Sequence, residues 1–332
     1  MDKTTPIVPL IKTQYALAFV DILKQIDSDI YPSITKAQLP ENILAPGHDY
    51  IPQRPLINLL NIIGEKAGPD RYSQLIWQVC RQVLIPSYIG KMQHAKTLEE
   101  ALIEFAQRFN QESLHSSVKL RHLAGRHWFI REHRFFSEQL QDFREHFIVT
   151  FMVELVRALI DRQWSPSAIM LTGSNADEIK ASLLVDNAQF YFNRSVIGLT
   201  LSTEELALPV KLRLHWQETS IHSPLKPTLF ADSLKQALKP YLGLGRLPIE
   251  AASGILGMPV RTIQRRLKKE NASYSNIVEN ILFNQACEML SDVNIPISRI
   301  ASSLGYSDLP HFSRAFKRIT GLSPRTYRQQ FR

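Results

Sequence analysis

The sequence predicts an α+β N-terminal domain followed by an all-α C-terminal domain with two helix-turn-helix units. Two observations predict this class. Helix-like and strand-like patterns are mixed up to about residue 210, whereas the patterns beyond residue 228 are helical. In the helical part, one pattern of residue types occurs twice. The length of 332 residues, about twice that of a typical domain, agrees with two domains.

The two predicted domains differ in charge. Prolines 224 and 227 predict a linker over residues 220–227, which separates an N-terminal domain (1–219) from a C-terminal domain (228–332). From residue 228 onward the chain has 15 basic and 7 acidic side chains, whereas residues 1–227 have 24 of each, so the whole net charge of +8 lies in the last third. This suggests a polyanionic partner, most often nucleic acid. A basic surface that only keeps the protein soluble is the alternative, and charge alone does not separate the two.

The N-terminal domain begins with helical patterns and continues with strands. An apolar face predicts a helix up to about Tyr31, and the prolines that follow predict a loop over 32–55. Thr97 is the expected N-cap of another helix, with Glu100 completing a capping box. The other expected elements are helices over 56–64, 69–83, 143–164 and 176–184, and strands over 117–122, 126–131, 168–172, 189–192 and 196–201.

The repeat in the C-terminal domain predicts two helix-turn-helix units, at about 249–269 and 297–319. Residues 250–269 and 299–318 share an apolar face, a Leu-Gly pair and a basic end. Gly257 and Gly305 follow helix ends, where a left-handed backbone favours glycine. Asp308 is the expected N-cap of the last helix of the repeat. The four apolar residues of the second helices have four-residue spacing and are expected in the core: Ile263, Leu267, Phe312 and Phe316.

The opposite faces of both second helices are polar and basic. Side chains expected to contact phosphates are Thr262, Lys268, Lys269, Ser313, Lys317 and Arg318. Arginine can pair with the edge of guanine and glutamine with that of adenine. A solvated basic helix is the alternative for one copy, but two matched copies favour binding to double-stranded DNA. A helix over about 275–290 would fix the spacing of the units, which on one face of DNA is ~34 Å.

These residues resemble the DNA-binding domain of the AraC/XylS family of bacterial transcriptional regulators. Residues 300–328 resemble the C-terminal signature of the family, and residues 260–274 are similar to its first recognition helix. Leu309-Pro310 departs from the usual pattern. The resemblance implies a cytoplasmic, nucleoid-associated regulator that forms a homodimer and contacts RNA polymerase. Whether it acts as an activator or a repressor depends on where its site lies relative to a promoter, which the sequence does not predict. The resemblance also implies base contacts by Arg261, Gln264, Arg265, His311 and Arg314.

Residues 39–208 resemble the arabinose-binding-like N-terminal domain of one branch of this family, chiefly over 167–209. Such domains sense an effector or dimerise, and the label does not establish which ligand is bound. An effector pocket would be apolar with a few polar groups, and the candidates on strand-like segments are Arg126, Trp128, Tyr191 and Arg194. A domain that only dimerises or docks a protein partner is the alternative.

Other chemistry is not predicted. Histidines 115, 122, 127, 133 and 146 lack the spacing of a metal site, and no cofactor loop or catalytic motif occurs, so we expect no metal, no cofactor and no enzyme. The triplet Arg-Glu-His occurs at 131–133 and again at 144–146, and the sequence gives it no function. Cys80 and Cys287 are expected to be buried free thiols in a reducing cytosol. No apolar run is long enough to cross a membrane.

Overall fold

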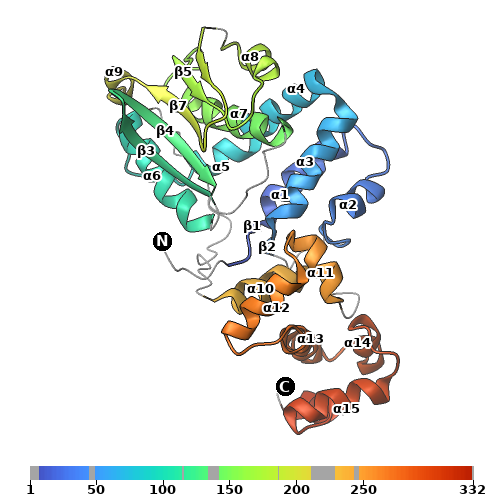
Figure 1. The fold of residues 1–332 in the computed structure, drawn as a ribbon. Coiled ribbons are helices and arrows are strands. Elements are labelled where there is room, and N and C mark those ends of the chain that lie inside the picture. The colour runs from blue at the N-terminus through green and yellow to red at the C-terminus, as the bar shows by residue number, and fades with distance from the viewer. Residues whose placement is uncertain are drawn as a thin grey trace. The chain divides into compact units, whose positions relative to one another are not determined.

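The computed structural model describes residues 7–44, 49–113, 116–133, 142–185, 187–210, 229–242 and 247–330. The chain divides into two compact units. We call residues 11–37 and 55–226 the N-terminal unit, and residues 1–10, 38–54 and 227–332 the C-terminal unit. Each unit has its own set of elements (Figure 1).

The N-terminal unit combines helices with one large sheet. Its helices are α1 (Thr13–Leu23), α2 (Tyr31–Ala37), α3 (Gln53–Ala67), α4 (Pro69–Val79), α5 (Ile85–Ile89), α6 (Leu98–Glu112), α7 (Asp142–Leu159), α8 (Asp177–Leu183) and α9 (Thr203–Leu206). A π-helical turn, Cys80–Leu84, connects α4 to α5. The helix α6 packs against β3, and α7 packs against β7 (Figure 1).

The sheet has five strands within the described residues, in the order β3-β4-β7-β5-β6. They are β3 (Ser116–Leu123), β4 (Arg126–His133), β5 (Ala168–Met170), β6 (Gln189–Tyr191) and β7 (Ile197–Leu201). The β5 and β6 strands are parallel, and the other neighbours are antiparallel. The central strand β7 is buried along its whole length because helices and strands surround it. The predicted α+β class is therefore confirmed.

Several local predictions for this unit need correction. The loop expected over 32–55 contains α2, because Ile34 and Ala37 are buried against other elements, and α3 already begins at Gln53. The first helix ends at Leu23 rather than near Tyr31. The Thr97 hydroxyl accepts a hydrogen bond from the N–H of Glu100 (3.3 Å), but the carboxylate of Glu100 accepts from Lys96 (2.7 Å) rather than from Thr97.

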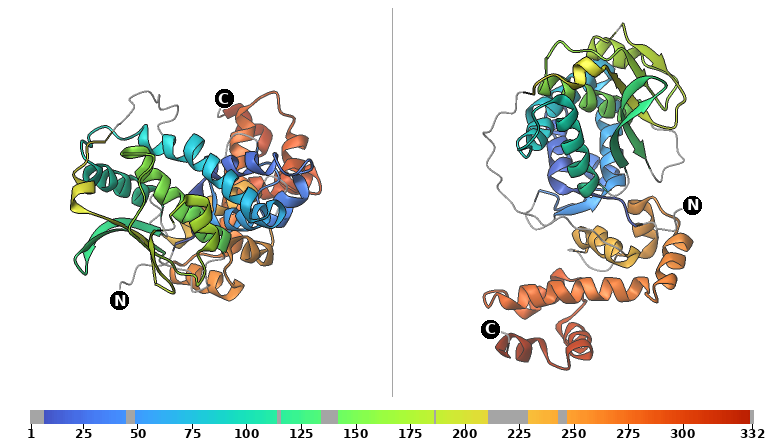
Figure 2. Two further views of the ribbon diagram at one scale, coloured as in Figure 1. Left: turned by 90° about the horizontal axis from the view of Figure 1, so that it is seen from above. Right: turned by 90° about the vertical axis from the view of Figure 1, so that its left-hand side faces the viewer.

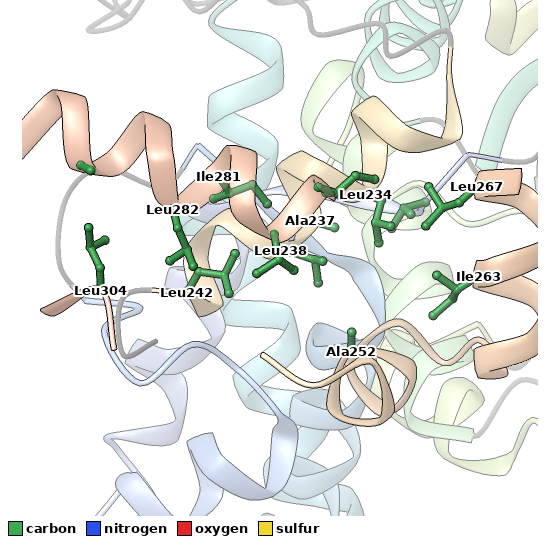
Figure 3. Close-up of a cluster of buried hydrophobic side chains, with 14 of the residues drawn as sticks. Leu234, Ala237, Leu238, Leu242, Ala252, Ile263, Leu267, Ile281, Leu282 and Leu304 are labelled. Atoms are coloured by element: carbon green, nitrogen blue, oxygen red, sulfur yellow. The ribbon is translucent and has the colours of Figure 1, made fainter. Parts of the chain in front are cut away.

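The C-terminal unit is helical from residue 229 onward within the described residues, as predicted. Its helices are α10 (Phe230–Leu238), α11 (Ile249–Leu256), α12 (Val260–Lys269), α13 (Tyr274–Ser291), α14 (Ile297–Ser303), α15 (Leu309–Thr320) and α16 (Pro324–Gln330). Apolar side chains of α10 to α13 converge in one cluster, to which Leu234, Ala252, Ile263 and Ile281 belong (Figure 3). The helix expected over about 275–290 is confirmed as α13, which lies between the α11–α12 pair and α14–α15 (Figure 2).

Two segments from the start of the chain complete this unit. Val8 and Leu10 are buried in the same apolar cluster as α10 to α13. The N–H of Val8 donates to the buried hydroxyl of Ser233 (2.8 Å), and the hydroxyl of Tyr241 donates to the carbonyl of Gln38 (2.9 Å). The strand β1 (Leu10–Lys12) pairs with β2 (Tyr50–Pro52). The expected domains 1–219 and 228–332 remain a prediction, and the expected linker 220–227 lies outside the described residues.

Candidate nucleic-acid interface

The two predicted turns have the same backbone geometry. Gly257 and Gly305 lie at φ of +61° and +75°, where a residue with a side chain would be strained. Each turn closes with a hydrogen bond from the N–H after the glycine to a carbonyl five residues earlier: Met258 to Ser253 (3.1 Å) and Tyr306 to Ala301 (3.0 Å). The sequence repeat therefore corresponds to a structural repeat, with α11–α12 and α14–α15 as its two helix pairs.

The inner faces of α12 and α15 form the core of each pair. Ile263 and Leu267 on α12, and Phe312 and Phe316 on α15, are all buried, as their four-residue spacing predicts. The ring of Phe312 packs edge-on against Tyr306, with centroids 5.2 Å apart. Because one face of each helix is fixed in the core, the opposite face is presented outward in a defined orientation.

The outer face of α12 is basic and exposed. Within the described chain, the exposed members of the predicted set are Arg261, Gln264, Arg265, Lys268 and Lys269, and Thr262 is half-buried. Positions 261, 264, 265 and 268 follow helical spacing and therefore share one face. Four exposed cations on one short helix produce a positive potential suited to a polyanion.

The outer face of α15 has the same character. His311, Arg314, Lys317 and Arg318 are exposed, and Ser313 is half-buried. Asp308 is the N-cap, as predicted: its carboxylate accepts from the N–H of His311 (2.6 Å), and this bond lowers the pKa of Asp308. Arg318 forms an ion pair with Glu279 of α13, so its charge is partly neutralised within the protein. The contacts of these residues with bases or phosphates remain predictions.

Arg266 is a basic residue of α12 that the sequence analysis did not assign. Its guanidinium lies 5.3 Å from the ring centroid of Phe230, and Nη1 donates to the sulfur of Met258 (3.4 Å). Burial lowers the pKa of Arg266. Arg266 lies on α12 between the exposed Arg265 and the buried Leu267, and it is half-buried. Arg266 therefore positions α12 against α10.

The long helix α13 connects the two pairs. With 18 residues it spans about 27 Å at the α-helical rise of 1.5 Å per residue. At its end, the guanidinium of Arg328 from α16 donates to the carbonyls of Leu290 (3.1 Å) and Ile295 (2.8 Å). These hydrogen bonds hold the connection between α13 and α14 in place. The spacing of the two outer faces is thus set by a rigid element.

Three of the four residues predicted for an effector lie close together: Trp128 on β4, Tyr191 on β6, and Arg194 in the loop after β6. Trp128 is buried, with its ring centroid 6.1 Å from that of Tyr191, and the guanidinium of Arg194 lies 5.7 Å from the Tyr191 ring. Arg126 is exposed at the start of β4, and none of the described contacts joins it to the other three. Trp128 also packs near Gly198 of β7. These contacts form a packed cluster, and a ligand-binding role for it remains a prediction.

Among the described residues, no three His, Cys, Asp or Glu side chains lie close enough together to hold a metal ion. In the same part of the chain, no helix is both long and apolar enough to span a bilayer. Cys80 is buried and Cys287 is half-buried, and neither forms a disulfide.

Known proteins match the region that contains the two helix pairs. Residues 253–330 match a family described as the helix-turn-helix domain. The C-terminal region is a helix-turn-helix domain of the AraC/XylS type. This matched segment begins inside α11 and ends at α16, so it contains both helix pairs and α13.

The relatives share this region with the chain. The HTH-type transcriptional regulator VqsM of Pseudomonas aeruginosa is 40% identical over 76 residues, 23% of each protein. The HTH-type transcriptional regulator VirS of Mycobacterium tuberculosis is 36% identical over 87 residues, 26% of each. The chain thus spans about a quarter of the length of these relatives. The crystal structure of the transcriptional regulator CdpR from Pseudomonas aeruginosa has 18% identity and a TM-score of 0.33, over 77% of this chain and 87% of that one.

Proposed function

We propose that this protein is a sequence-specific DNA-binding transcriptional regulator whose N-terminal unit binds a small-molecule effector. The observation that supports the DNA-binding half is the duplicated helix pair, which has matched turns, matched cores and two exposed basic faces. The names of the relatives VqsM and VirS describe regulators of transcription, which supports the same proposal and gives no support to an enzyme.

In this proposal α12 and α15 enter successive segments of the major groove. Arg265 and Arg314 occupy equivalent positions of the repeat and contact base edges, because a guanidinium can donate two hydrogen bonds to guanine. Gln264, Arg261 and His311 contact bases beside them. The phosphates are bound by the hydroxyls and cations at the sides and ends of both helices: Thr262, Lys268, Lys269, Ser313, Lys317 and Arg318.

Selection of bound sites from a random pool of duplexes tests the DNA-binding half. We expect the full chain to enrich one site with two sequence blocks about one helical turn apart. The double variant Arg265→Ala, Arg314→Ala should retain salt-sensitive binding to bulk DNA but enrich no site. If the wild-type protein shows no preference for any sequence at physiological salt, the proposal is wrong.

Thermal unfolding with a library of metabolites tests the effector half. A ligand that binds only the folded state stabilises it by RT ln(1 + [L]/Kd), which is about 2.7 kcal/mol at a hundredfold excess over Kd. A saturable shift by one compound class supports an effector-binding N-terminal unit. If no compound in a fair library shifts the unfolding temperature, and the protein dimerises through this unit, the alternative is favoured. In that alternative the N-terminal unit only dimerises or docks a protein partner. The homodimer and the contact with RNA polymerase are part of the proposal in either case.

A further inference from the structure

A polar groove lies in the N-terminal unit between α4 and α8, which are neighbours in the fold (Figure 1). Its volume is about 820 Å³, within the range of small-molecule sites. The residues of its walls that the argument uses are Asp70, Trp77, Gln78, Glu178 and Ser182. Two carboxylates lie on its walls, and no lysine or arginine is among the described residues that line it. The groove is thus negative in charge and rich in hydrogen-bonding groups.

A buried polar stripe of α7 lies behind this groove. His146, Thr150 and Glu154 follow one another at four-residue spacing, and each is at most 2% exposed. The Nε2 atom of His146 is 3.0 Å from the hydroxyl of Ser182. Within the described residues, the Nδ1 atom of His146 and the hydroxyl of Thr150 have no hydrogen-bond partner. An unpaired buried polar group costs about 1–3 kcal/mol, so a hydrogen-bond partner at these two positions would be stabilising.

His146 contacts two residues of the groove wall, Ser182 and Glu178. Its Nδ1 atom points toward the carboxylate of Glu178, at 3.9 Å, which is too long for a hydrogen bond. Burial lowers the pKa of His146 to about 4, so the ring is neutral near pH 7. The hydroxyl of Ser182 donates to the carbonyl of Ile179 (3.3 Å), and its oxygen lies 3.0 Å from Nε2 of His146. The lone pairs of Ser182 then face the groove as acceptors, as the carboxylate of Glu178 does.

Two arginines near the groove, Arg81 and Arg157, interact with another acid. Arg81 lies 4.5 Å over the ring of Trp77, and its Nε is 3.3 Å from Glu154. Glu154 also binds Arg157 at 2.9 Å. These arginines therefore interact with the buried carboxylate of Glu154. Asp70 and Glu178 provide the charge at the groove walls, and the adjoining π-helical turn Cys80–Leu84 is a kind of element often found at functional sites.

We propose that the α4–α8 groove binds a small organic ammonium compound, whose N–H groups donate to Glu178 and Ser182. Asp70 adds negative charge, and the amide of Gln78 hydrogen-bonds the polar groups of the ligand. An ammonium offers three donors and no acceptor, which complements walls that present acceptors. This proposal rests on the proposed effector-binding function of the N-terminal unit. It places the effector apart from the cluster of Trp128, Tyr191 and Arg194.

Calorimetric titration of the full chain tests the site. The probes are 1,4-diaminobutane and ethanolamine, with 1,4-butanediol and succinate as neutral and anionic controls. We expect saturable binding of an amine and none of the controls. Glu178→Gln should weaken that binding about tenfold or more, because it removes a charge-assisted hydrogen bond. Asp177→Asn is the matched control, because Asp177 is the adjacent acid of α8, is exposed and does not line the groove; it should leave the affinity unchanged.

Several outcomes would overturn the proposal. These are no saturable binding of either amine at millimolar concentration, equal affinity in Glu178→Gln and the wild type, or binding of the diol or the dicarboxylate as tight as that of the amine. Far-ultraviolet circular dichroism verifies that each variant is folded. If another compound class shifts thermal unfolding equally in the wild type and Glu178→Gln, the groove assignment fails while effector sensing survives. If no compound of any charge binds, both fail, and site selection still tests DNA binding separately.

Discussion

Arg265 and Lys269 lie four residues apart on α12, both exposed, yet we expect them to contact different parts of DNA. Arg265→Ala should cost about 1–3 kcal/mol on the selected site and much less on random DNA, because a base contact is lost. Lys269→Ala should weaken binding to all sequences alike and lower the slope of log affinity against log salt by about 1. Titrations of both duplexes over a series of salt concentrations measure this. Equal losses on both duplexes for Arg265→Ala would contradict its assignment.

The buried His146 predicts sensitivity to acid. Its pKa is about 4 in the folded protein because burial disfavours the charged ring, against 6.5 in the unfolded chain. The groups that face it are Ser182, Glu178 and the ring of Tyr72. Above pH 6.5 His146 is neutral in both the folded and the unfolded state, so it does not lower the free energy of unfolding. As the pH falls from 6.5 toward 4, only the unfolded chain takes up the proton, so stability falls by up to about 3 kcal/mol.

The midpoint of urea unfolding, measured near pH 7.5 and near pH 5, tests this effect. These two pH values lie about one unit or more above and below the pKa of an unfolded histidine. His146→Gln cannot take up the proton, and it should lose less stability between the two pH values than the wild type. His94→Gln, at an exposed histidine, is the control and should behave as the wild type. Equal acid sensitivity in His146→Gln and the wild type would show that His146 is not the group responsible.

At the scale of the element, the start of α15 depends on one side chain. The carboxylate of Asp308 accepts from the N–H of His311, and this bond lowers its pKa below the usual 3.8. Asp308→Ala should lower the melting temperature, because it leaves an N–H of the first turn unpaired. Asp308→Asn keeps an acceptor and should retain most of the stability. The ionised carboxylate of Asp308 stabilises the folded state above pH 3.8, and this stabilisation is lost as the pH falls through the lower pKa of the folded state. Thermal unfolding of both variants checks this, and equal melting temperatures would contradict it.

Helices with a clear apolar face were predictable from the sequence, but helices that depend on distant contacts were not. Ile263 and Leu267, and likewise Phe312 and Phe316, show their helix and its buried side through spacing alone. The short helix α2 begins beside Pro32 and has no such pattern, so its formation depends on the burial of Ile34 and Ala37. The π-helical turn Cys80–Leu84 adds no sequence signal to the helix predicted over 69–83.

The exposed residues of the candidate interface were also predictable from the apolar spacing of α12 and α15, but the contacts with distant segments were not. The exposure of Arg265 and Arg314 follows from the buried positions beside them, so their outward orientation was expected and is observed. The role of Arg266 was not predictable, because its partners Phe230 and Met258 come from separate segments. The same holds for the groove of α4 and α8, whose residues are about a hundred positions apart and meet only through tertiary packing.

At the scale of the whole molecule, the chain enters the C-terminal unit twice before it reaches α10. Residues 1–10 and 38–54 belong to that unit, whereas 11–37 belong to the other. Beside Gly257, the nearest side-chain atom to an added Cβ would be Cδ of Arg54, at 3.5 Å, so the 38–54 segment reaches the first turn of the repeat. The sequence does not predict this arrangement, because these segments show no repeat and no charge difference that would separate them from their neighbours.

Leu10 therefore contributes to the stability of the C-terminal unit although it lies more than 200 residues from α10 in sequence. Leu10→Ala should destabilise that unit by about 2–5 kcal/mol, as expected for truncation of a buried leucine. Leu44→Ala, at a leucine of the 38–54 segment that is 48% exposed, is the control and should have little effect.

The described tryptophans, Trp77, Trp128 and Trp164, belong to the N-terminal unit, so their fluorescence reports on that unit, whereas circular dichroism reports on the helices of both. Leu10→Ala should lower the midpoint of the dichroism transition of the C-terminal unit and leave the fluorescence midpoint unchanged. DNA affinity should fall at temperatures between these midpoints, because less of the C-terminal unit is folded. A fragment of residues 228–332 lacks Val8 and Leu10 and should be less stable for the same reason. A shift of the fluorescence midpoint in Leu10→Ala without the dichroism shift would assign Leu10 to the other unit.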